Sequence, residues 1–310
     1  MRKAFIDTLC SLAQQDERIV LLTADLGFLA IEPFRDRFPN RFFNVGVAEQ
    51  NMIGMTTGLA EAGLRPYAYS IATFASLRPF EFIRNGPVMH KLDVRVVGMG
   101  MGFEYGHSGP THFGVEDVAV MRTLPGITVV IPADYEQTAT AIRDTCDVSG
   151  PIYYSLGKDD KTLMPGLKGR FELGRIQITR SGSDVAILSM GSISSEVDAA
   201  ANQLEQVGVH VTVAVVSNFN PNPEHDLVEL LKQFSFALTV EAQTISGGLG
   251  AFAASVIAAN GLPCRLCTLG VRTPPDGTSG NQQERWRKNG LDRGAIVHNV
   301  LSMLRIQPAQ

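Results

Sequence analysis

The sequence is poor in cysteine and contains no long hydrophobic run. Four of its 310 residues are cysteine, too few for a disulfide-based scaffold, and this usage is typical of the reducing cytoplasm. No stretch approaches the ~20 consecutive apolar residues that a membrane-spanning helix needs. The first residues, Met-Arg-Lys-Ala-Phe-Ile-Asp, lack the apolar segment of a signal peptide. We therefore expect a cytoplasmic protein that does not enter a membrane.

The sequence also lacks a strong charge of one sign. Its 27 basic and 31 acidic residues give a formal net charge of −4, and neither end carries a charged tail. This balance indicates neither a nucleic-acid-binding surface nor a basic surface for anionic membranes. Hydrophobic residues make up 45% of the chain and charged residues 19%, which is a globular composition. At ~150 residues per domain, the length predicts about two domains.

Short apolar segments alternate with longer amphipathic ones along the whole chain, which is typical of parallel α/β sheets. Strands are predicted at 19–23, 41–45, 68–70, 94–99, 126–131, 152–155, 184–190, 209–216, 236–240 and 264–269. The longer helices are predicted at 4–15, 49–61, from about 134, and at 195–206, 225–233, 249–259 and 292–304. A segment at 158–180, rich in glycine and charge, reads as a linker or an edge hairpin. The fold class is therefore α/β, with two doubly wound domains in tandem.

Residues 44–52, Asn-Val-Gly-Val-Ala-Glu-Gln-Asn-Met, place a carboxylate soon after a glycine turn. Glu49 begins an apolar helix there, at the edge where strand ends of an open sheet gather and ligands bind. The alternative is structural, because a glutamate in the first turn of a helix is favoured by the helix dipole. Both interpretations remain open at this point.

Residues 99–114 form a long loop after a predicted strand, with five glycines and two histidines. Such a loop lets the backbone approach a ligand and supplies imidazoles for proton transfer. The alternative is an ordinary long connection, although loops of this length in compact domains are often functional.

Residues 73–82 combine Phe74, Phe80 and Phe82 with Arg78. The aromatic side chains could stack on a planar ring with the arginine near an anion, or they could simply belong to the core. The sequence has no phosphate-binding G-x-x-x-x-G-K-[ST] loop, no G-x-S-x-G elbow and no H-E-x-x-H motif. Local motifs therefore indicate a site at one sheet edge without a complete catalytic set.

Together these motifs resemble the thiamine-diphosphate enzymes of the transketolase type. Residues 44–50 are similar to the family's G-[IV]-A-E-Q segment, and Gly-Pro-Thr-His at 109–112 is similar to its G-P-T-H loop. Ala-Asp-Leu at 24–26 follows the first strand as in the family, and the part from 182 to 250 resembles its C-terminal domain. The resemblance covers nearly the whole chain. It implies a pyrimidine-binding domain at 1–165 and a transketolase C-terminal domain at 166–310.

The diphosphate-binding domain of full-length relatives, with its G-D-G…N segment, has no counterpart in this sequence. The chain therefore resembles the C-terminal subunit of a split transketolase. This implies thiamine diphosphate as cofactor, with Mg²⁺ or Ca²⁺ held by the partner and no metal ligand on this chain. It also implies a diphosphate-binding partner subunit in an α2β2 assembly, self-association, and sugar substrates.

The resemblance also implies roles for individual residues. Glu49 would hydrogen-bond N1′ of the aminopyrimidine, and His112 would assist proton transfer at substrate hydroxyls. Phe74 would stack on the aminopyrimidine, with Phe80 or Phe82 completing the pocket. The further cofactor-binding expectations are Asp25 and Arg78. The expected substrate-binding residues are Glu104, Tyr105, His107, Ser108 and Lys158.

Three positions depart from the transketolase pattern. Gly100 stands where the family keeps a histidine for substrate phosphate, Ser108 where it keeps an aspartate, and Leu156 where it keeps a phosphate-binding arginine. Losing the histidine and the arginine removes charge-assisted hydrogen bonds to a phosphate. We therefore hypothesise a substrate other than an ordinary pentose phosphate, such as an unphosphorylated or nucleotide-linked sugar.

The resemblance implies transfer of a two-carbon ketol unit from a ketose to an aldose. One alternative keeps the cofactor and changes the reaction: the β subunit of a 2-oxoacid dehydrogenase, or a decarboxylase like deoxyxylulose-phosphate synthase. Another alternative is a regulatory or structural subunit without catalytic activity, which the presence of Glu49, Phe74 and His112 argues against.

Overall fold

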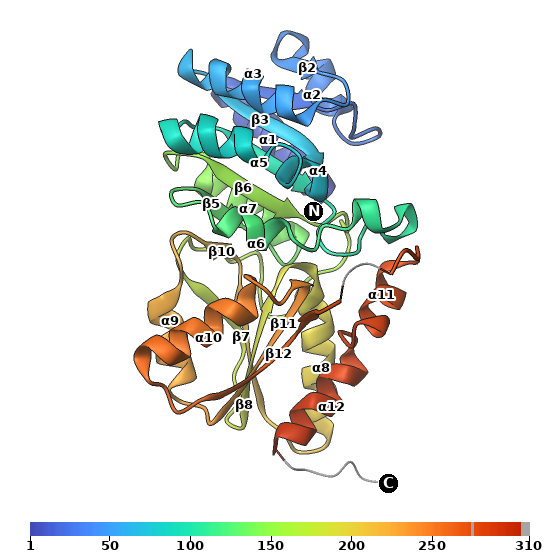
Figure 1. Cartoon of the computed structure of the whole chain (residues 1–310), viewed down its shortest axis with the longest axis vertical. Helices are drawn as coiled ribbons and strands as arrows, with labels where there is room; N and C mark the ends of the chain where they lie inside the picture. The colour runs from blue at the N-terminus through green and yellow to red at the C-terminus, as the bar shows by residue number, and fades with distance from the viewer. Residues whose placement is uncertain (274–275, 305–310) are drawn as a thin grey trace.

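The computed structural model describes residues 1–273 and 276–304, and it folds into two α/β units stacked end to end (Figure 1). The N-terminus lies beside the boundary between the units. Within the described residues, no helix is long and apolar enough to cross a membrane.

The first unit is built on a seven-stranded sheet in the order β10-β5-β6-β4-β3-β1-β2. Six of these strands are parallel and come from the first half of the chain. They are β1 (Ile19–Thr23), β2 (Phe42–Asn44), β3 (Arg65–Ile71), β4 (Arg95–Met99), β5 (Thr128–Val130) and β6 (Ile152–Leu156). Strands β1, β3, β4, β5 and β6 are buried along their whole length. Continuous apolar segments are typical of parallel strands covered on both faces.

Helices cover both faces of this sheet. On one face, α1 (Arg2–Gln15) packs against α7 (Tyr135–Thr145), and their side chains join Tyr67 and Tyr69 of β3 in one core cluster. On the other face, α3 (Glu49–Glu61) and α5 (Phe80–Ile83) pack with Ala68. The alternation of β3 residues between the two clusters follows the two-residue period of a strand. The shorter elements are α2 (Glu32–Arg37), η1 (Pro39–Arg41), α4 (Ala72–Ser76), η2 (Arg84–Val88), η3 (Gly106–Ser108), η4 (Pro110–His112) and α6 (Asp117–Arg122).

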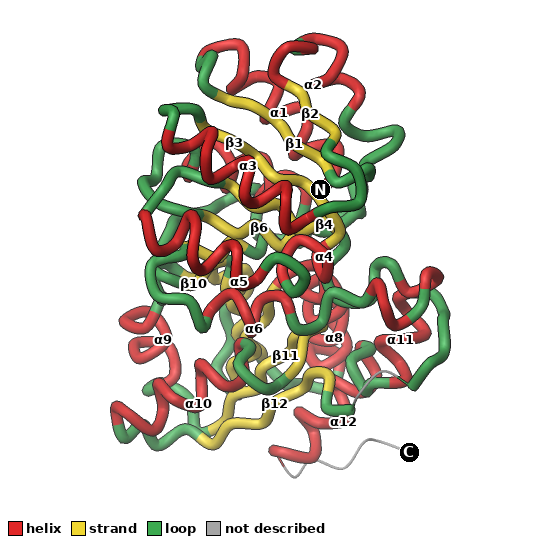
Figure 2. The backbone as a smooth tube through the Cα atoms, turned by 45° about the horizontal axis from the view of Figure 1, so that its top comes forward, coloured by secondary structure: helices red, strands yellow, loops and turns green. Residues whose placement is uncertain are grey.

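The second unit contains a five-stranded sheet in the order β12-β11-β8-β9-β7. Its strands are β7 (Ile176–Arg180), β8 (Val185–Met190), β9 (Val211–Val216), β11 (Phe236–Thr244) and β12 (Arg265–Val271). Its helical elements are η5 (Gly191–Ile193), α8 (Ser194–Gln206), α9 (Glu224–Leu231), α10 (Leu249–Asn260), α11 (Gln282–Lys288) and α12 (Arg293–Leu304). Helices α8 and α12 pack on one face, while α9 and α10 pack on the other (Figure 2).

The two units are joined by more than the connecting chain. Strand β10 (Asn218–Phe219) follows β9 but leaves the second sheet and pairs antiparallel with β5 of the first. Phe219 packs edge-on against Phe252 of α10, with ring centroids 5.5 Å apart. The guanidinium of Arg122, from α6, lies 4.2 Å from the Phe219 ring centroid. One hydrophobic cluster therefore continues from the first sheet into the second unit.

The predicted α/β class with two doubly wound domains is confirmed, and several elements have the predicted bounds. Strand β1 and helix α3 begin and end where the pattern placed them. The segment 158–180 is not a hairpin, because β7 is a single edge strand that pairs antiparallel with β9. Short helices such as α4 and α6 were not predicted, since five or six residues are too few to show a helical period. The end of the second predicted domain, 305–310, lies outside the described residues.

Candidate active site

The predicted site residues lie at one edge of the first sheet, where its parallel strands end. Asp25 follows β1, Glu49 follows β2, and Lys158 follows β6. Helix α4, which carries Phe74, begins directly after β3, and the loop 100–116 follows β4. In open α/β sheets, ligands bind outside the carboxyl ends of the strands.

Glu49 is a buried carboxylate at the beginning of α3, with 1% of the residue exposed. Ser70, near the end of β3, donates a hydrogen bond from Oγ to Glu49 Oε1 at 3.1 Å. Arg78 donates from Nη1 to Glu49 Oε2 at 2.6 Å. Burying a carboxylate away from water costs free energy unless the group is paired and hydrogen-bonded. Glu49 is therefore held by one hydroxyl and one guanidinium at the edge of the sheet.

Phe74 lies beside this ion pair. The guanidinium carbon of Arg78 is 4.2 Å from the centroid of the Phe74 ring, which is a cation–π contact. The Arg78 side chain is 42% exposed. Arg78 therefore bridges the buried carboxylate and the aromatic face from the solvent side.

His112 is the next side chain along the sheet edge. Its ring packs edge-on against Phe74, with centroids 5.1 Å apart, and lies 6.4 Å from the ring centroid of Tyr105. Thr111 Oγ1 lies 2.9 Å from His112 Nδ1, so Nε2 is the ring nitrogen without this contact. A histidine whose one nitrogen is fixed by a neighbour is suited to exchange protons at the other.

Tyr105 and Lys158 extend this series of side-chain contacts beyond His112. The Lys158 Nζ lies 4.0 Å from the centroid of the Tyr105 ring, and burial lowers the pKa of this lysine. Its nearest hydrogen-bond acceptor is the backbone oxygen of Glu104, at 3.5 Å. We call the six contiguous side chains the site row. They are Glu49, Arg78, Phe74, His112, Tyr105 and Lys158.

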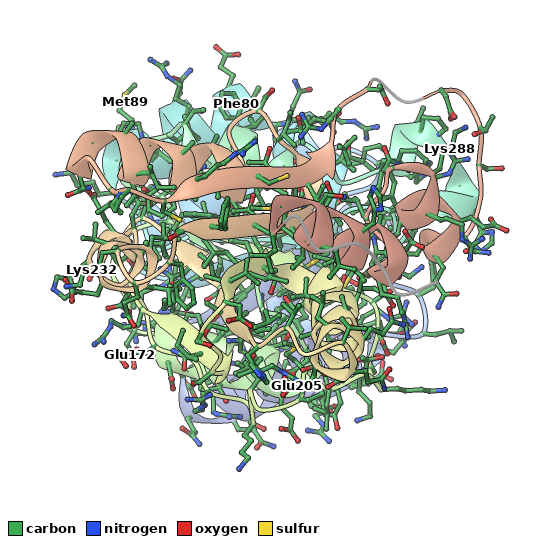
Figure 3. The ribbon with its side chains drawn as sticks, turned by 90° about the horizontal axis from the view of Figure 1, so that it is seen from below. Phe80, Met89, Glu172, Glu205, Lys232 and Lys288 are labelled. Atoms are coloured by element: carbon green, nitrogen blue, oxygen red, sulfur yellow. The ribbon has the colours of Figure 1, made fainter. Side chains whose placement is uncertain are left out.

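The remaining predicted site residues are less closely connected. Asp25 is exposed, adopts φ 56°, and accepts a hydrogen bond from Asn44 Nδ2 at 2.9 Å. Phe80 packs partly against the core cluster and lies at one edge of the view in Figure 3, while Phe82 is 42% exposed. Two further predicted residues, His107 and Ser108, are exposed on the loop after β4.

Glu104 supports the site row from behind. Its carboxylate accepts hydrogen bonds from the Lys158 backbone N–H and from Ser192 Oγ, the latter at 2.9 Å. Burial raises the pKa of Glu104 to about 7, and these hydrogen bonds oppose that rise. Ser192 belongs to the second unit, so this carboxylate ties the loop after β4 to both β6 and the second sheet. Glu104 also lines a cavity of about 310 Å³ together with Trp286 of α11.

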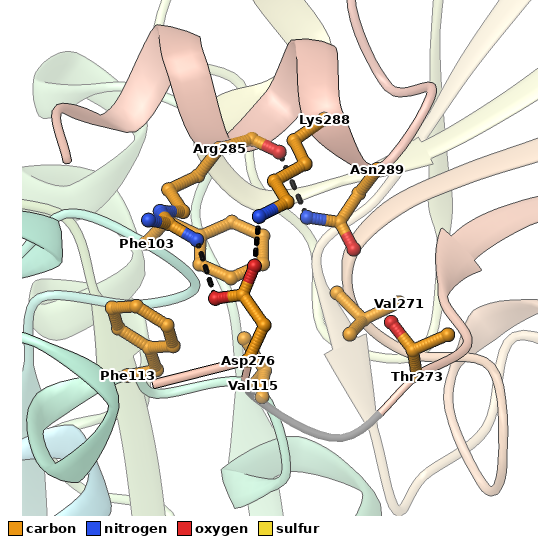
Figure 4. Close-up of a pocket in the computed structure, with 9 residues that line it drawn as sticks. All are labelled: Phe103, Phe113, Val115, Val271, Thr273, Asp276, Arg285, Lys288 and Asn289. Atoms are coloured by element: carbon orange, nitrogen blue, oxygen red, sulfur yellow. Dashed lines mark hydrogen bonds and ion pairs between the residues drawn. The ribbon is translucent and has the colours of Figure 1, made fainter. Parts of the chain in front are cut away.

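The loop after β4 is fixed at its base by the second unit. Gly102 and Gly114 exchange backbone hydrogen bonds of 2.7 and 2.8 Å, which close the loop. Phe103 and Phe113 pack edge-on, 5.1 Å apart, and line a cavity of about 100 Å³ with Asp276 and Arg285 (Figure 4). Arg285 Nη1 donates to Asp276 at 3.1 Å there. Two members of the site row, Tyr105 and His112, therefore lie on a loop whose base is held by these contacts.

Sequence reasoning missed several residues that hold the site. Ser70 is a polar residue one position before the end of a buried strand, which is a usable signal. Asn44, at the end of β2, bonds both the backbone and the side chain of Asp25. Ser192 gives no local signal, because it comes from the other unit. Among the described residues, no group of three or more His, Cys, Asp or Glu side chains could hold a metal ion.

The chain was compared with known protein families and proteins. Residues 1–160 match the family model "Transketolase, pyrimidine binding domain", and residues 174–288 match "Transketolase, C-terminal domain". The chain is 36% identical to a transketolase C-terminal section of Methanocaldococcus jannaschii, over 98% of this chain and 96% of that protein. It is 34% identical to a 6-deoxy-6-sulfo-D-fructose transketolase subunit of a Clostridium species, over 88% and 84%.

A solved structure is similar along the entire chain. It is a split-gene transketolase in an inactive β4 tetramer, with a TM-score of 0.86 and 32% identity over 99% of this chain and 98% of that one. A 1-deoxy-D-xylulose-5-phosphate synthase of Oleidesulfovibrio alaskensis is 30% identical, and the match covers 98% of this chain and 48% of the synthase.

Proposed function

The chain belongs to the transketolase family, and on that premise we propose that it is the subunit of a split transketolase that binds the aminopyrimidine half of thiamine diphosphate. The proposed reaction is transfer of a two-carbon ketol unit from a ketose to an aldose. The observation that carries the proposal is that the buried carboxylate of Glu49 and the aromatic face of Phe74 both contact the same flat cation, the Arg78 guanidinium.

The residues of the site row fit this cofactor. Between Glu49 and Phe74 lies the Arg78 guanidinium, a flat cation that donates to the carboxylate and stacks on the ring. The gap therefore suits a planar group with ring nitrogens that can be protonated, and an aminopyrimidine is such a group. When bound, thiamine diphosphate supplies the nucleophilic carbon that carries the two-carbon unit.

Each residue of this chain has a proposed task toward that group. Glu49 would share a proton with a ring nitrogen, which requires a carboxyl group because an amide cannot exchange the proton. Phe74 would fix the plane of the ring, with Phe80 or Phe82 and Asp25 near the cofactor. His112, held at Nδ1 by Thr111, would move protons at substrate hydroxyls through Nε2.

The other end of the site row is proposed to bind the sugar. Tyr105 and Lys158 lie beyond His112, with His107 and Ser108 exposed on the same loop and Glu104 behind them. A substrate other than an ordinary pentose phosphate remains the proposal. Support comes from the relative that is named for a sulfonated six-carbon sugar.

We propose that the working enzyme is an α2β2 assembly with a diphosphate-binding partner that holds Mg²⁺ or Ca²⁺. The subunit names of the relatives and the tetrameric solved structure support an oligomer. Apolar side chains exposed near the site edge support a covered surface there. They include Phe28, Leu29, Phe43 and Val47. The cytoplasm is the proposed compartment, because cysteines without disulfides suit a reducing environment.

A domain boundary at residue 165 also remains a proposal. The two family models match 1–160 and 174–288, so they leave the boundary between them. The described strands of the first unit's parallel sheet end at Leu156, and β7 begins at Ile176.

Products distinguish ketol transfer from the main alternative. The chain, combined with its diphosphate-binding partner, thiamine diphosphate and Mg²⁺, is incubated with ketose donors and aldose acceptors or with pyruvate. Transfer of glycolaldehyde units supports the proposal. Consumption of pyruvate with release of CO₂ would instead support a decarboxylase, the alternative that similarity to a deoxyxylulose-phosphate synthase favours. No turnover of any substrate, with full cofactor binding, would support a structural subunit.

A further inference from the structure

Arg78 occupies the gap between Glu49 and Phe74 that the proposed function assigns to the cofactor's ring. Its Nη1 lies 2.6 Å from Glu49 Oε2, and its guanidinium carbon lies 4.2 Å from the Phe74 ring centroid. The side chain therefore makes both contacts at once: a hydrogen bond to the buried carboxylate and stacking on the aromatic face. These are the two contacts that a bound aminopyrimidine would make with the same residues.

The guanidinium matches the ring chemically as well as in position. It is planar, delocalised and rich in N–H donors, and it stacks on aromatic faces. A protonated aminopyrimidine is also planar, cationic and able to donate N–H groups to a carboxylate. The guanidinium and the aminopyrimidine ring therefore compete for the same carboxylate and the same aromatic face, and binding of one excludes the other.

The ion pair also serves the chain in the absence of cofactor. Glu49 is 1% exposed, and an uncompensated buried carboxylate is strongly destabilising. Within the described residues, Ser70 is the other side chain that donates a hydrogen bond to it. Arg78 thus stabilises the empty site by supplying the charge that the cofactor would otherwise provide.

Arg78 can leave without rearranging the core. It lies in the short connection between α4, which ends at Ser76, and α5, which begins at Phe80. Its side chain is 42% exposed, so rotation toward solvent breaks the hydrogen bond to Glu49 and the stacking on Phe74.

We propose that Arg78 is an internal competitor for the cofactor's aminopyrimidine ring, which binds only after the guanidinium has left Glu49 and Phe74. The inference rests on the proposed function, since it takes Glu49 and Phe74 as the ring's site. The apparent affinity for the cofactor is then the intrinsic affinity multiplied by the fraction of molecules in which Arg78 is away from the site. Arg78 therefore sets how tightly the subunit takes up its cofactor.

The test measures cofactor affinity by isothermal titration calorimetry. Thiamine diphosphate with Mg²⁺ is titrated into the complex of this chain with its diphosphate-binding partner, as wild type, Arg78→Met and Arg84→Met. Arg84 is the matched control, because it is an exposed arginine nearby that bonds Asn85 rather than Glu49. We expect Arg78→Met to bind the cofactor about tenfold more tightly than wild type. This is the gain expected if Arg78 contacts Glu49 and Phe74 in about 90% of cofactor-free wild-type molecules. Arg84→Met should bind like wild type.

A second measurement follows thermal stability without relying on turnover. Cofactor-free Arg78→Met should unfold at a lower temperature than wild type, because Glu49 is left buried and unpaired. Its rise in unfolding temperature on addition of cofactor should exceed that of wild type. The unfolding temperature of Arg78→Met without cofactor therefore shows whether the variant folds, and its rise on addition of cofactor shows whether Arg78 competes with the cofactor.

The outcomes separate this inference from the function beneath it. Equal affinity of wild type and Arg78→Met overturns the competition and leaves the proposed function standing. Weaker binding by Arg78→Met also overturns it, and makes Arg78 a direct cofactor ligand. If the wild-type complex binds no thiamine diphosphate at all, the proposed function fails and this inference fails with it.

Discussion

The ring of Tyr105 fills the space beside Gly100. A Cβ atom at position 100 would lie 2.2 Å from Cδ2 of Tyr105, and Gly100 has φ +81°, a conformation that side chains rarely adopt. Position 100 therefore carries no side chain unless Tyr105 moves. Because Tyr105 also holds the Lys158 ammonium over its ring, the glycine at position 100 and the Tyr105–Lys158 pair form a single structural feature.

Gly100→Ala should displace the Tyr105 ring and destabilise the chain. The control is Gly208→Ala, because Gly208 also has a positive φ, +78°, but a Cβ there would meet nothing within 4 Å. Both variants pay for the left-handed backbone, about 1–2 kcal/mol. The steric conflict should cost Gly100→Ala a further 1–3 kcal/mol or so. Urea unfolding measures both, and equal losses would show that Tyr105 adapts without strain.

Lys158→Met should weaken binding of sugars that end in a phosphate or sulfonate. A hydrogen bond to a charged group contributes about 1.5–3 kcal/mol, so KM should rise at least about tenfold. The value of kcat should change little, since the lysine lies at the far end of the site row from Glu49. Steady-state kinetics of the complex, with the exposed Lys161→Met as control, measures this. An unchanged KM for every anionic sugar would remove Lys158 from the substrate site.

Glu49→Gln should keep the fold and lose the reaction. The amide retains the size of the side chain and a hydrogen-bond acceptor, but it cannot exchange a proton with a ring nitrogen. We expect kcat to fall at least about 100-fold, the usual scale of one acid–base group. Glu61→Gln, an exposed residue at the other end of α3, is the control. Full activity in Glu49→Gln would contradict the role of Glu49 and favour a structural subunit.

Glu104 should make the stability of the chain depend on pH. Burial raises the pKa of Glu104 from 4.5 to about 7, so between these values the folded state binds more protons than the unfolded state. The free energy of unfolding therefore falls as pH rises through this window. The fall is at most about 3.4 kcal/mol, since one pKa unit corresponds to about 1.4 kcal/mol.

Glu104→Gln should remove this component, which urea unfolding at pH 4.5, 6 and 7.5 would reveal. Part of the dependence should remain, because burial also raises the pKa of Glu241 to about 7. The control is Glu17→Gln, an exposed residue in the loop before β1. The same pH dependence in wild type and Glu104→Gln would show that Glu104 is ionised across the whole range.

Much of the fold could be predicted because many of its helices and strands follow from patterns of neighbouring residues. Strand β1 is five consecutive apolar or β-branched residues, all buried, and helix α3 begins at the carboxylate that follows a glycine turn. Strand β10, with two residues, was not predictable, since so short a strand has no period. It exists because antiparallel pairing with β5 satisfies its backbone, and β5 lies in the other unit.

The sequence by itself determined the fold class, the family resemblance and which residue types gather at the sheet edge, because apolar period and motif order are properties of neighbouring residues. Tertiary structure alone decided which of those residues touch. Glu49 meets Arg78 across 29 positions of the chain, and Glu104 meets Ser192 across 88. These contacts depend on how two sheets bring distant loops together and on which charge can reach a buried carboxylate. No local pattern encodes either.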